Sequence, residues 1–201
     1  MKKYILFFTL SVFLLTSCGS NEMKFPDDNN GSSIEVEENR EKEKPQEDME
    51  SKEQENEKEE ENPEEEPSET TKELSQMEEK MINLVNEERE KEGLSKLELD
   101  KNLRKIARLK SKDISEKDYF SHTSPTYGTP FEMMEEFDIS FKMAAENLAG
   151  HRSVNLAHEG LMDSKGHREN ILRPELTYIG VGIVEDQKYG YIFTQMFITK
   201  R

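Results

Sequence analysis

The chain has 201 residues, with 44 acidic side chains against 28 lysines and arginines, for a net charge of −16. An acidic chain without a basic face does not attract nucleic acid, so we expect no nucleic-acid partner. Cys18 is the single cysteine, so an internal disulfide is excluded and a folded domain must be held by its apolar core.

The N-terminus is typical of an export signal. Lys2 and Lys3 precede an apolar run, Tyr4–Leu15. About 12 apolar residues are too few for a membrane-spanning helix, which needs roughly 20, but they suit the apolar part of a signal peptide. The run ends in "LLTSCG", which resembles the bacterial lipobox and implies a lipoprotein signal peptide over residues 1–17 with lipid attached to Cys18. The alternative is an ordinary signal peptide followed by an incidental cysteine.

Residues 18–71 are predicted to be a disordered acidic linker. Within them, residues 35–70 carry 18 acidic and five basic side chains, a net charge of −13, and almost no apolar ones. Such a segment cannot bury enough apolar surface to offset the entropy of ordering, and its like charges repel and extend it. We interpret it as a tether; the alternative is an acidic tail that binds a cation or a partner. The folded domain is assigned to residues 72–201.

Four helices are predicted in the domain from apolar residues at helical spacing and from helix-start signals. They cover Leu74–Arg89, a segment that begins at Asp100 and reaches Ser115, residues 128–137, and Val154–Asp163, which Ser153 caps. The third has the best-marked start. Thr129 and Glu132 can form a capping box around a proline at the first helical position.

The C-terminal part changes to a strand pattern. Tyr178–Val184 and Tyr191–Ile198 flank a turn at Glu185–Gly190. In the first strand, Gly180 and Gly182 occupy one face, which predicts that another element approaches the backbone closely there. Helices followed by a hairpin indicate an α+β domain with an antiparallel sheet covered by helices.

Three short stretches carry residues that can do chemistry. "YFSHTSPTYG" contains His122, "AAENLAG" contains Glu146 and "SKGHRENIL" contains His167. We expect all three in loops or at helix ends, and "AENLAG" taken alone reads as a helix end. In this order, from about Leu74 to Ile198, they resemble the CAP superfamily of cysteine-rich secretory, antigen 5 and pathogenesis-related 1 proteins, or SCP domains. The absence of cysteines from this region and the motif "GHRENIL" are similar to the bacterial branch.

The resemblance implies an α-β-α sandwich with a central antiparallel sheet between helical layers. It also implies a cleft lined by His122, Glu146 and His167. Two neutral imidazoles and a carboxylate suit a borderline divalent metal such as zinc. The same groups could position a base for proton transfer.

The sequence departs from the family pattern at one acidic position. Many animal and plant members have a second glutamate shortly after a tryptophan on the helix before the second histidine. The corresponding positions here are Ser164 and Leu161, which leaves Asp163 or Glu159 to substitute. We therefore expect a weak, partly open metal site.

Other residues near these motifs have structural interpretations. His158 lies within a predicted helix and is expected to pack or face solvent, whereas His151 follows "AENLAG" in a loop and could approach the cleft. Arg168 and Asn170 are expected to satisfy backbone carbonyls in a loop that presents His167.

Function is predicted as a binding module for a small ligand, with lipids, sterols and peptides implied by the resemblance, or for a divalent metal. The alternatives are a metal-assisted, protease-like hydrolase with His122 or His167 as the base, and an envelope-interaction protein with a vestigial cleft. Ser121 and Ser124 flank His122, but no serine lies in a recognisable activated-nucleophile motif. We expect an exported monomer, lipid-anchored to the cell membrane with its domain outside.

Overall fold

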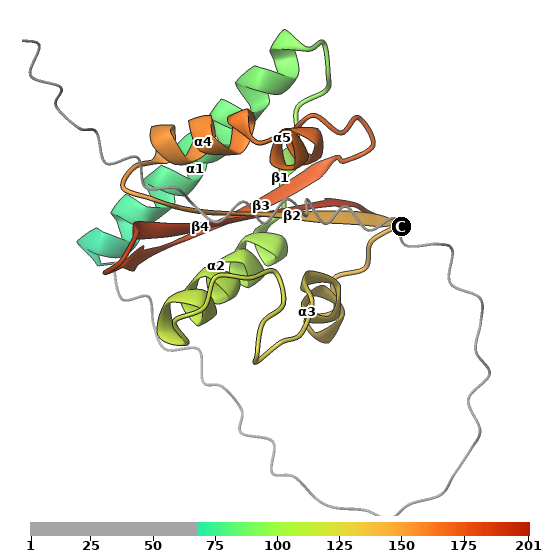
Figure 1. Cartoon of the computed structure of the whole chain (residues 1–201). Helices are drawn as coiled ribbons and strands as arrows, with labels where there is room; N and C mark the ends of the chain where they lie inside the picture. Colours follow the sequence, from blue (N-terminus) through green and yellow to red (C-terminus); the bar gives the residue numbers. More distant parts are fainter. Residues whose placement is uncertain (1–67) are drawn as a thin grey trace, which may run out of the picture.

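The computed structural model describes residues 68–201 and shows an α+β domain in which one sheet lies between two helical layers (Figure 1). The elements in chain order are α1 (Glu69–Lys91), β1 (Glu98–Leu99), α2 (Lys101–Glu116), α3 (Pro130–Glu136), β2 (Met143–His151), α4 (Val154–Asp163), α5 (Lys165–Ile171), β3 (Tyr178–Asp186) and β4 (Gly190–Thr199). The signal peptide, the lipid site at Cys18 and the linker as far as residue 67 lie outside the described residues.

The sheet has the strand order β1-β3-β4-β2. The predicted hairpin is present, with β3 antiparallel to β4, and β2 pairs antiparallel to the other side of β4. The expected antiparallel sheet is therefore confirmed, and β1 adds a two-residue parallel edge beside β3. As a result, β2 forms one edge of the sheet along its whole length.

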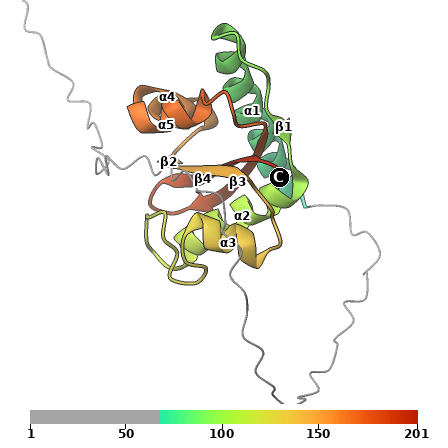
Figure 2. The same cartoon turned by 90° about the vertical axis from the view of Figure 1, so that its right-hand side faces the viewer.

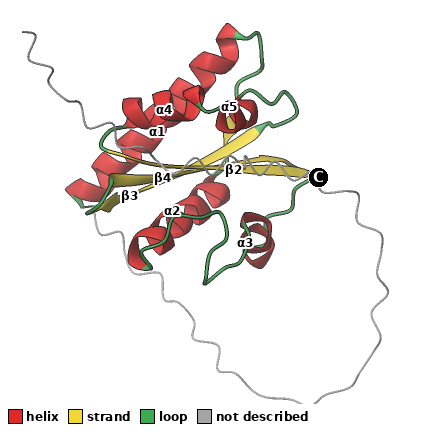
Figure 3. Ribbon diagram, viewed as in Figure 1, coloured by secondary structure: helices red, strands yellow, loops and turns green. Residues whose placement is uncertain are grey.

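The helices divide between the two faces of the sheet. α1, α4 and α5 cover one face, and α2 and α3 cover the other, as two perpendicular views show (Figures 1 and 2). The strands lie between the two groups of helices (Figure 3). Each face of the sheet has its own apolar core, because strand residues alternate between the two sides. Ala145 of β2 joins the core under α1 and α4, whereas Ala144 joins the core over α2 and α3.

The helix starts follow the predicted caps. The side chains of Asp100, Thr129 and Ser153 accept hydrogen bonds from backbone N–H groups of the first turns, and Thr129 and Glu132 form the complete capping box. The first helix begins earlier than the predicted Leu74, at Glu69 after a cap by Ser68.

Two local predictions were wrong. "AENLAG" is not a helix end but lies within β2, where nine residues pair with β4. "SKGHRENIL" is not a loop, because residues 165–171 form the short helix α5. In both cases, contacts with distant parts of the chain override weak local preferences.

The glycine face of β3 seats α2 directly on the sheet, as predicted. A Cβ atom built on Gly182 would lie 2.1 Å from the backbone carbon of Ala107, and one on Gly180 would lie 2.4 Å from that of Leu103. Only residues without side chains allow a helix to come this close. This contact seats α2 on β3, and α2 also packs on β4, so the start of the loop that carries His122 is fixed relative to the sheet.

Within residues 68–201, no helix is both long enough and apolar enough to cross a membrane.

Candidate functional site

The three predicted site residues come from three different elements that meet at the free edge of β2. Glu146 lies in the middle of β2, His122 lies in the loop between α2 and α3, and His167 lies in α5. This loop belongs to the layer on one face of the sheet and α5 to the layer on the other (Figure 2). The site therefore spans the edge of the sheet from one layer to the other.

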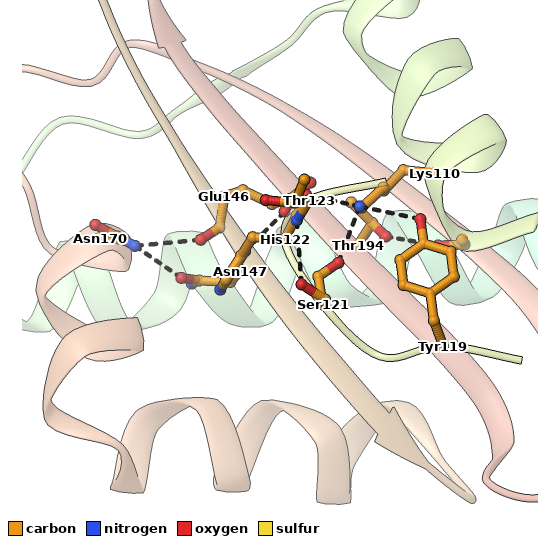
Figure 4. Close-up of polar contacts among 10 residues, drawn as sticks. Lys110, Tyr119, Ser121, His122, Thr123, Glu146, Asn147, Asn170 and Thr194 are labelled. Atoms are coloured by element: carbon orange, nitrogen blue, oxygen red, sulfur yellow. Dashed lines mark hydrogen bonds and ion pairs between the residues drawn. The ribbon is translucent and has the colours of Figure 1, made fainter. Parts of the chain in front are cut away.

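A hydrogen bond joins His122 to Glu146. The distance from Nδ1 to Oε1 is 2.7 Å, and the two side chains are 26% and 2% exposed (Figure 4). An ionised carboxylate only accepts, so Nδ1–H is the donor to Glu146, and Nε2 is the ring nitrogen that this hydrogen bond leaves for another partner. Glu146 thus sets both the tautomer and the orientation of His122.

Glu146 is an acid in an apolar setting. Burial raises its pKa, while the hydrogen bond from His122 and the positive charge of Lys110 oppose that rise. Its second oxygen, Oε2, is buried and has no hydrogen-bond partner among the described residues. A buried acceptor of this kind costs about 1–3 kcal/mol of stability when left unpaired. The buried carboxylate therefore lowers the stability of the domain, which indicates that it is present for the function of the site.

Lys110 of α2 anchors the loop that carries His122. It is only 1% exposed, and Nζ donates to the carbonyls of His122 at 2.7 Å and Ser121 at 2.9 Å and to the Tyr119 hydroxyl at 3.2 Å (Figure 4). Burial lowers the pKa of Lys110, and the charges of Glu146 and Asp113 act in the opposite direction. Lys110 thereby fixes the backbone at His122.

The sequence interpretation missed Lys110, although a signal was present. Lys110 follows Leu103 and Ala107 and precedes Ile114 at helical spacing, on the apolar stripe of α2. A lysine on such a stripe must bury its charge or turn it toward polar groups, so its position alone marks a polar site.

Asp113 braces the same loop from α2. Its carboxylate accepts hydrogen bonds of 2.6 Å from the hydroxyls of Tyr119, Ser124 and Thr126. Hydrogen bonds from these hydroxyls hold the pKa of Asp113 below its usual range although burial raises it. The Ser124 hydroxyl is therefore committed to Asp113, and the hydroxyl of Ser121 accepts from the backbone N–H of Thr123.

Asn147 connects the opposite face of β2 to α5. Its Nδ2 donates to the His167 carbonyl at 3.1 Å and to Gln195 Oε1 at 3.0 Å. Asn170 Nδ2 in turn donates to Asn147 Oδ1 at 2.9 Å and to the Glu146 carbonyl at 3.4 Å (Figure 4). Consecutive strand residues point to opposite faces, so the pair Glu146-Asn147 holds the His122 loop on one side and α5 on the other.

His167 is half-buried in α5. Burial lowers its pKa, and the nearby charge of His122 lowers it further. His167 is thus close enough to His122 to feel a positive charge on that ring, although the two residues come from opposite layers.

The remaining candidates lie around this site. Arg168 and Asn170 both bind outside the segment that presents His167: Arg168 Nη1 donates to the Met162 carbonyl in α4 at 2.6 Å, and Asn170 binds β2. His158 was expected either to pack in the core or to face solvent, and it is buried in α4. His151 ends β2, and its Nδ1 accepts from the Arg152 N–H. Five strand residues place His151 about 16 Å from Glu146.

The donor set differs from a three-ligand metal site. No group of three or more His, Cys, Asp or Glu side chains in residues 68–201 is arranged to hold a metal ion. Glu159 and Asp163, the predicted substitutes for the missing carboxylate, are exposed. Because Oε1 of Glu146 contacts His122, this carboxylate is placed as the outer partner of a histidine, an arrangement typical of metal-binding imidazoles.

Two Bacillus subtilis proteins are similar in sequence. The uncharacterized protein YkwD is 50% identical over 128 residues, which cover 63% of this chain and 49% of YkwD. The uncharacterized membrane protein YlbC is 39% identical over 124 residues, which cover 61% of this chain and 34% of YlbC. This chain therefore matches half or less of the length of these curated relatives.

Solved structures share the fold. An extracellular SCP-domain protein from Bacillus anthracis is 33% identical with a TM-score of 0.59, over 63% of this chain and 41% of that one. An outer surface protein from Borrelia burgdorferi has a TM-score of 0.60 at 23% identity, over 64% of this chain and 96% of that one, which supports the fold alone. The family model described as the cysteine-rich secretory protein family, CAP, matches residues 82–197, and the chain belongs to this family.

Proposed function

We propose that this protein is an exported binding module whose site is formed by His122 and His167, with Glu146 orienting His122. The observation that carries the proposal is the 2.7 Å hydrogen bond between His122 Nδ1 and the buried Glu146 carboxylate. Export is supported by the signal-like N-terminus and by the relative from Bacillus anthracis, which is described as extracellular.

The energetic cost of this arrangement favours a functional role. A leucine in place of Glu146 would pack the edge of β2 without burying a charge, and a buried ion pair is rarely more stable than an apolar replacement. Carboxylates whose pKa is raised by burial beside a histidine are typical of binding and catalytic sites. The occupant is therefore expected to contact the imidazoles.

The occupant we propose is a divalent metal held by two imidazoles, since residues 68–201 offer no group of three ligands. His122 Nε2 and a ring nitrogen of His167 would hold the ion, and Glu146 would strengthen His122 as a ligand. Bound zinc would act as a Lewis acid with positions open to a further small ligand, such as the head of a lipid or a peptide. The serine hydroxyls beside His122 contact the loop and Asp113, so the geometry favours binding over nucleophilic catalysis.

Zinc calorimetry on the full-length protein tests this proposal. We expect one saturable site in the wild type, no measurable site in His167→Ala, and an affinity about 10–100-fold weaker in Glu146→Gln, where the outer partner loses its charge. Affinity should fall as the pH is lowered, because protonated imidazoles do not bind metal. The lowered pKa of His167 keeps that ring neutral to a lower pH than an ordinary histidine.

His151→Ala is the matched control, since it removes a histidine at the far end of β2 and leaves the acidic residues 35–70 unchanged. It should bind zinc like the wild type. Equal zinc binding by the wild type and His167→Ala would show that the measured heat comes from other groups. If neither protein binds zinc, the metal is ruled out, and an organic ligand becomes the proposed occupant.

Membrane anchoring is a separate proposal that rests on Cys18. We expect Cys18→Ser to release the protein into the soluble fraction of cells, because the described residues contain no helix suited to cross a membrane. Fractionation followed by immunoblotting measures the distribution. Retention of Cys18→Ser in the membrane fraction at the wild-type level would contradict lipid attachment at this residue.

A further inference from the structure

A groove on the opposite side of the domain has no role in the site described above. It lies where α1 and α2 meet beside β3, and has a volume of about 440 Å³. Leu74, Leu109 and Ile183 supply an apolar floor, and the exposed Lys105 and Lys112 stand at its rim. An apolar floor with a cationic rim suits a ligand that has both apolar surface and negative charge.

The groove has an excess of positive charge. Glu78, which is fully buried, is the one acidic residue that lines it among the described residues. Arg108 donates two hydrogen bonds of 2.7 and 2.6 Å to this carboxylate, and Arg104 Nε lies 3.6 Å from it. One carboxylate therefore faces two guanidinium groups, in addition to Lys105 and Lys112.

Arg104 is incompletely satisfied. Its Nε and Nη2 atoms are buried, and neither has a hydrogen-bond partner among the described residues. Because these atoms are buried and Arg104 does not line the groove, Arg104 adds positive charge next to Glu78 but offers no donors to a ligand in the groove. The cations that do line the groove are Lys105, Arg108 and Lys112, and with the apolar floor they suit a ligand that carries several carboxylates and some apolar surface.

The chain itself supplies such a ligand next to the groove. Thr71 lines the groove, so residues 59–67, the acidic segment, enter α1 at its border. The acidic segment has the sequence "EEENPEEEP", with six glutamates, two prolines and no lysine or arginine. We propose that the acidic segment binds this groove, with its glutamates at Lys105, Arg108 and Lys112 and its prolines over the apolar floor.

Proximity along the chain makes this interaction effective although each ion pair is weak. Nine residues reach at most about 30 Å, so the segment stays within range of the groove at an effective concentration in the millimolar range. Ionic strength screens exposed pairs strongly. The acidic segment thus covers the groove reversibly, and salt releases it and lengthens the tether.

Zero-length carbodiimide cross-linking of the full-length protein tests the proposal, because it joins an amine to a carboxylate only in direct contact. We expect Lys105 and Lys112 to couple to residues 59–66 about tenfold more often than Lys165 does, since the segment is held near them. Lys165 is 82% exposed and lies on the other helical layer, which makes it the reference amine. The enrichment should vanish in about 0.5 M salt and be independent of protein concentration.

Matched linker variants separate docking from random encounters without affecting the fold. Glutamines in place of the three glutamates of residues 64–66 cannot be cross-linked, so residues 59–61 report on docking in this variant. Their enriched cross-links to Lys105 and Lys112 should be lost. Replacing Glu53, Glu55 and Glu57 makes the same change in charge and should leave them at the wild-type level. Equal coupling of Lys105 and Lys165, or equal effects of both triple variants, would overturn the proposal.

The competing occupant is an anionic membrane, whose phosphate groups would also suit the cationic rim. Vesicles of phosphatidylglycerol distinguish the two. If they shield Lys105 and Lys112 from acetylation while the full-length protein shows no enriched cross-link to residues 59–66, the groove is a membrane contact and our assignment fails.

Discussion

Gly182→Ala is expected to lower the free energy of unfolding by about 3 kcal/mol or more, which is a large part of the stability of a domain of this size. The added Cβ would lie 2.1 Å from the Ala107 carbonyl carbon and from the Arg108 nitrogen. Both are backbone atoms of α2, so no side chain can rotate to relieve the clash. The helix would have to move away from the sheet, and with it Lys110 and the His122 loop.

Urea unfolding of the full-length protein, followed by far-UV circular dichroism, measures this effect. Gly160→Ala is the matched control, because a Cβ there has no atom within 4 Å and the residue lies inside α4. We expect this variant to be more stable than the wild type by about 0.5–1 kcal/mol, from helix propensity alone. Equal midpoints for both alanine variants would contradict the close seating of α2.

Arg89→Met is expected to cost about 4 kcal/mol of stability, because each buried carbonyl that loses its donor costs about 1–3 kcal/mol. Arg89 is almost fully buried, and its guanidinium donates to the carbonyls of Ser95, Ile171, Arg173 and Leu176 at 2.8–3.2 Å. Methionine fills a similar volume but donates no hydrogen bond. The carbonyls of Ile171 and Leu176, whose hydrogen bonds to Arg89 are buried, would lose the guanidinium as their donor.

The same change should weaken zinc binding, since the Ile171 carbonyl belongs to the last residue of α5, the helix that carries His167. Lys91→Met provides the control, because Lys91 is exposed at the end of α1, the helix that contains Arg89, and forms an ion pair of 2.7 Å with Glu88. A surface pair is worth about 0–1 kcal/mol, so this variant should unfold like the wild type. Similar unfolding curves for the two methionine variants would show that Arg89 does not hold α5.

Both predictions concern contacts that connect α2 or α5 to the sheet, and the site depends on both connections. His122 is placed by Lys110 and Glu146, and α5 is placed by Asn147 and Arg89. A change at any of these points would alter the separation of the two imidazoles without touching them. Stability and zinc affinity should therefore fall together in such variants.

Local features of the chain could be predicted because their causes are local. Asp100, Thr129 and Ser153 bond to backbone groups within three residues, so the starts of α2, α3 and α4 depend on neighbours in sequence. The alternation in β3 and the glycines that admit α2 are likewise visible in a few residues. The candidates His122, Glu146 and His167 came from resemblance to a family, because nothing in their spacing brings them together.

The strand β2 shows what the sequence by itself could not determine. Its central "AAENLA" is rich in helix-forming residues, and it is a strand because Met143–His151 pair with β4, some fifty residues away in the chain. That pairing places Glu146 and Asn147 on opposite faces of an edge strand. The hydrogen bond to His122, the contact with α5 and the burial of Lys110 all follow from it. Sequence thus determined where elements begin, through short-range hydrogen bonds, and only the tertiary structure decided the site, because its contacts join segments that are distant along the chain.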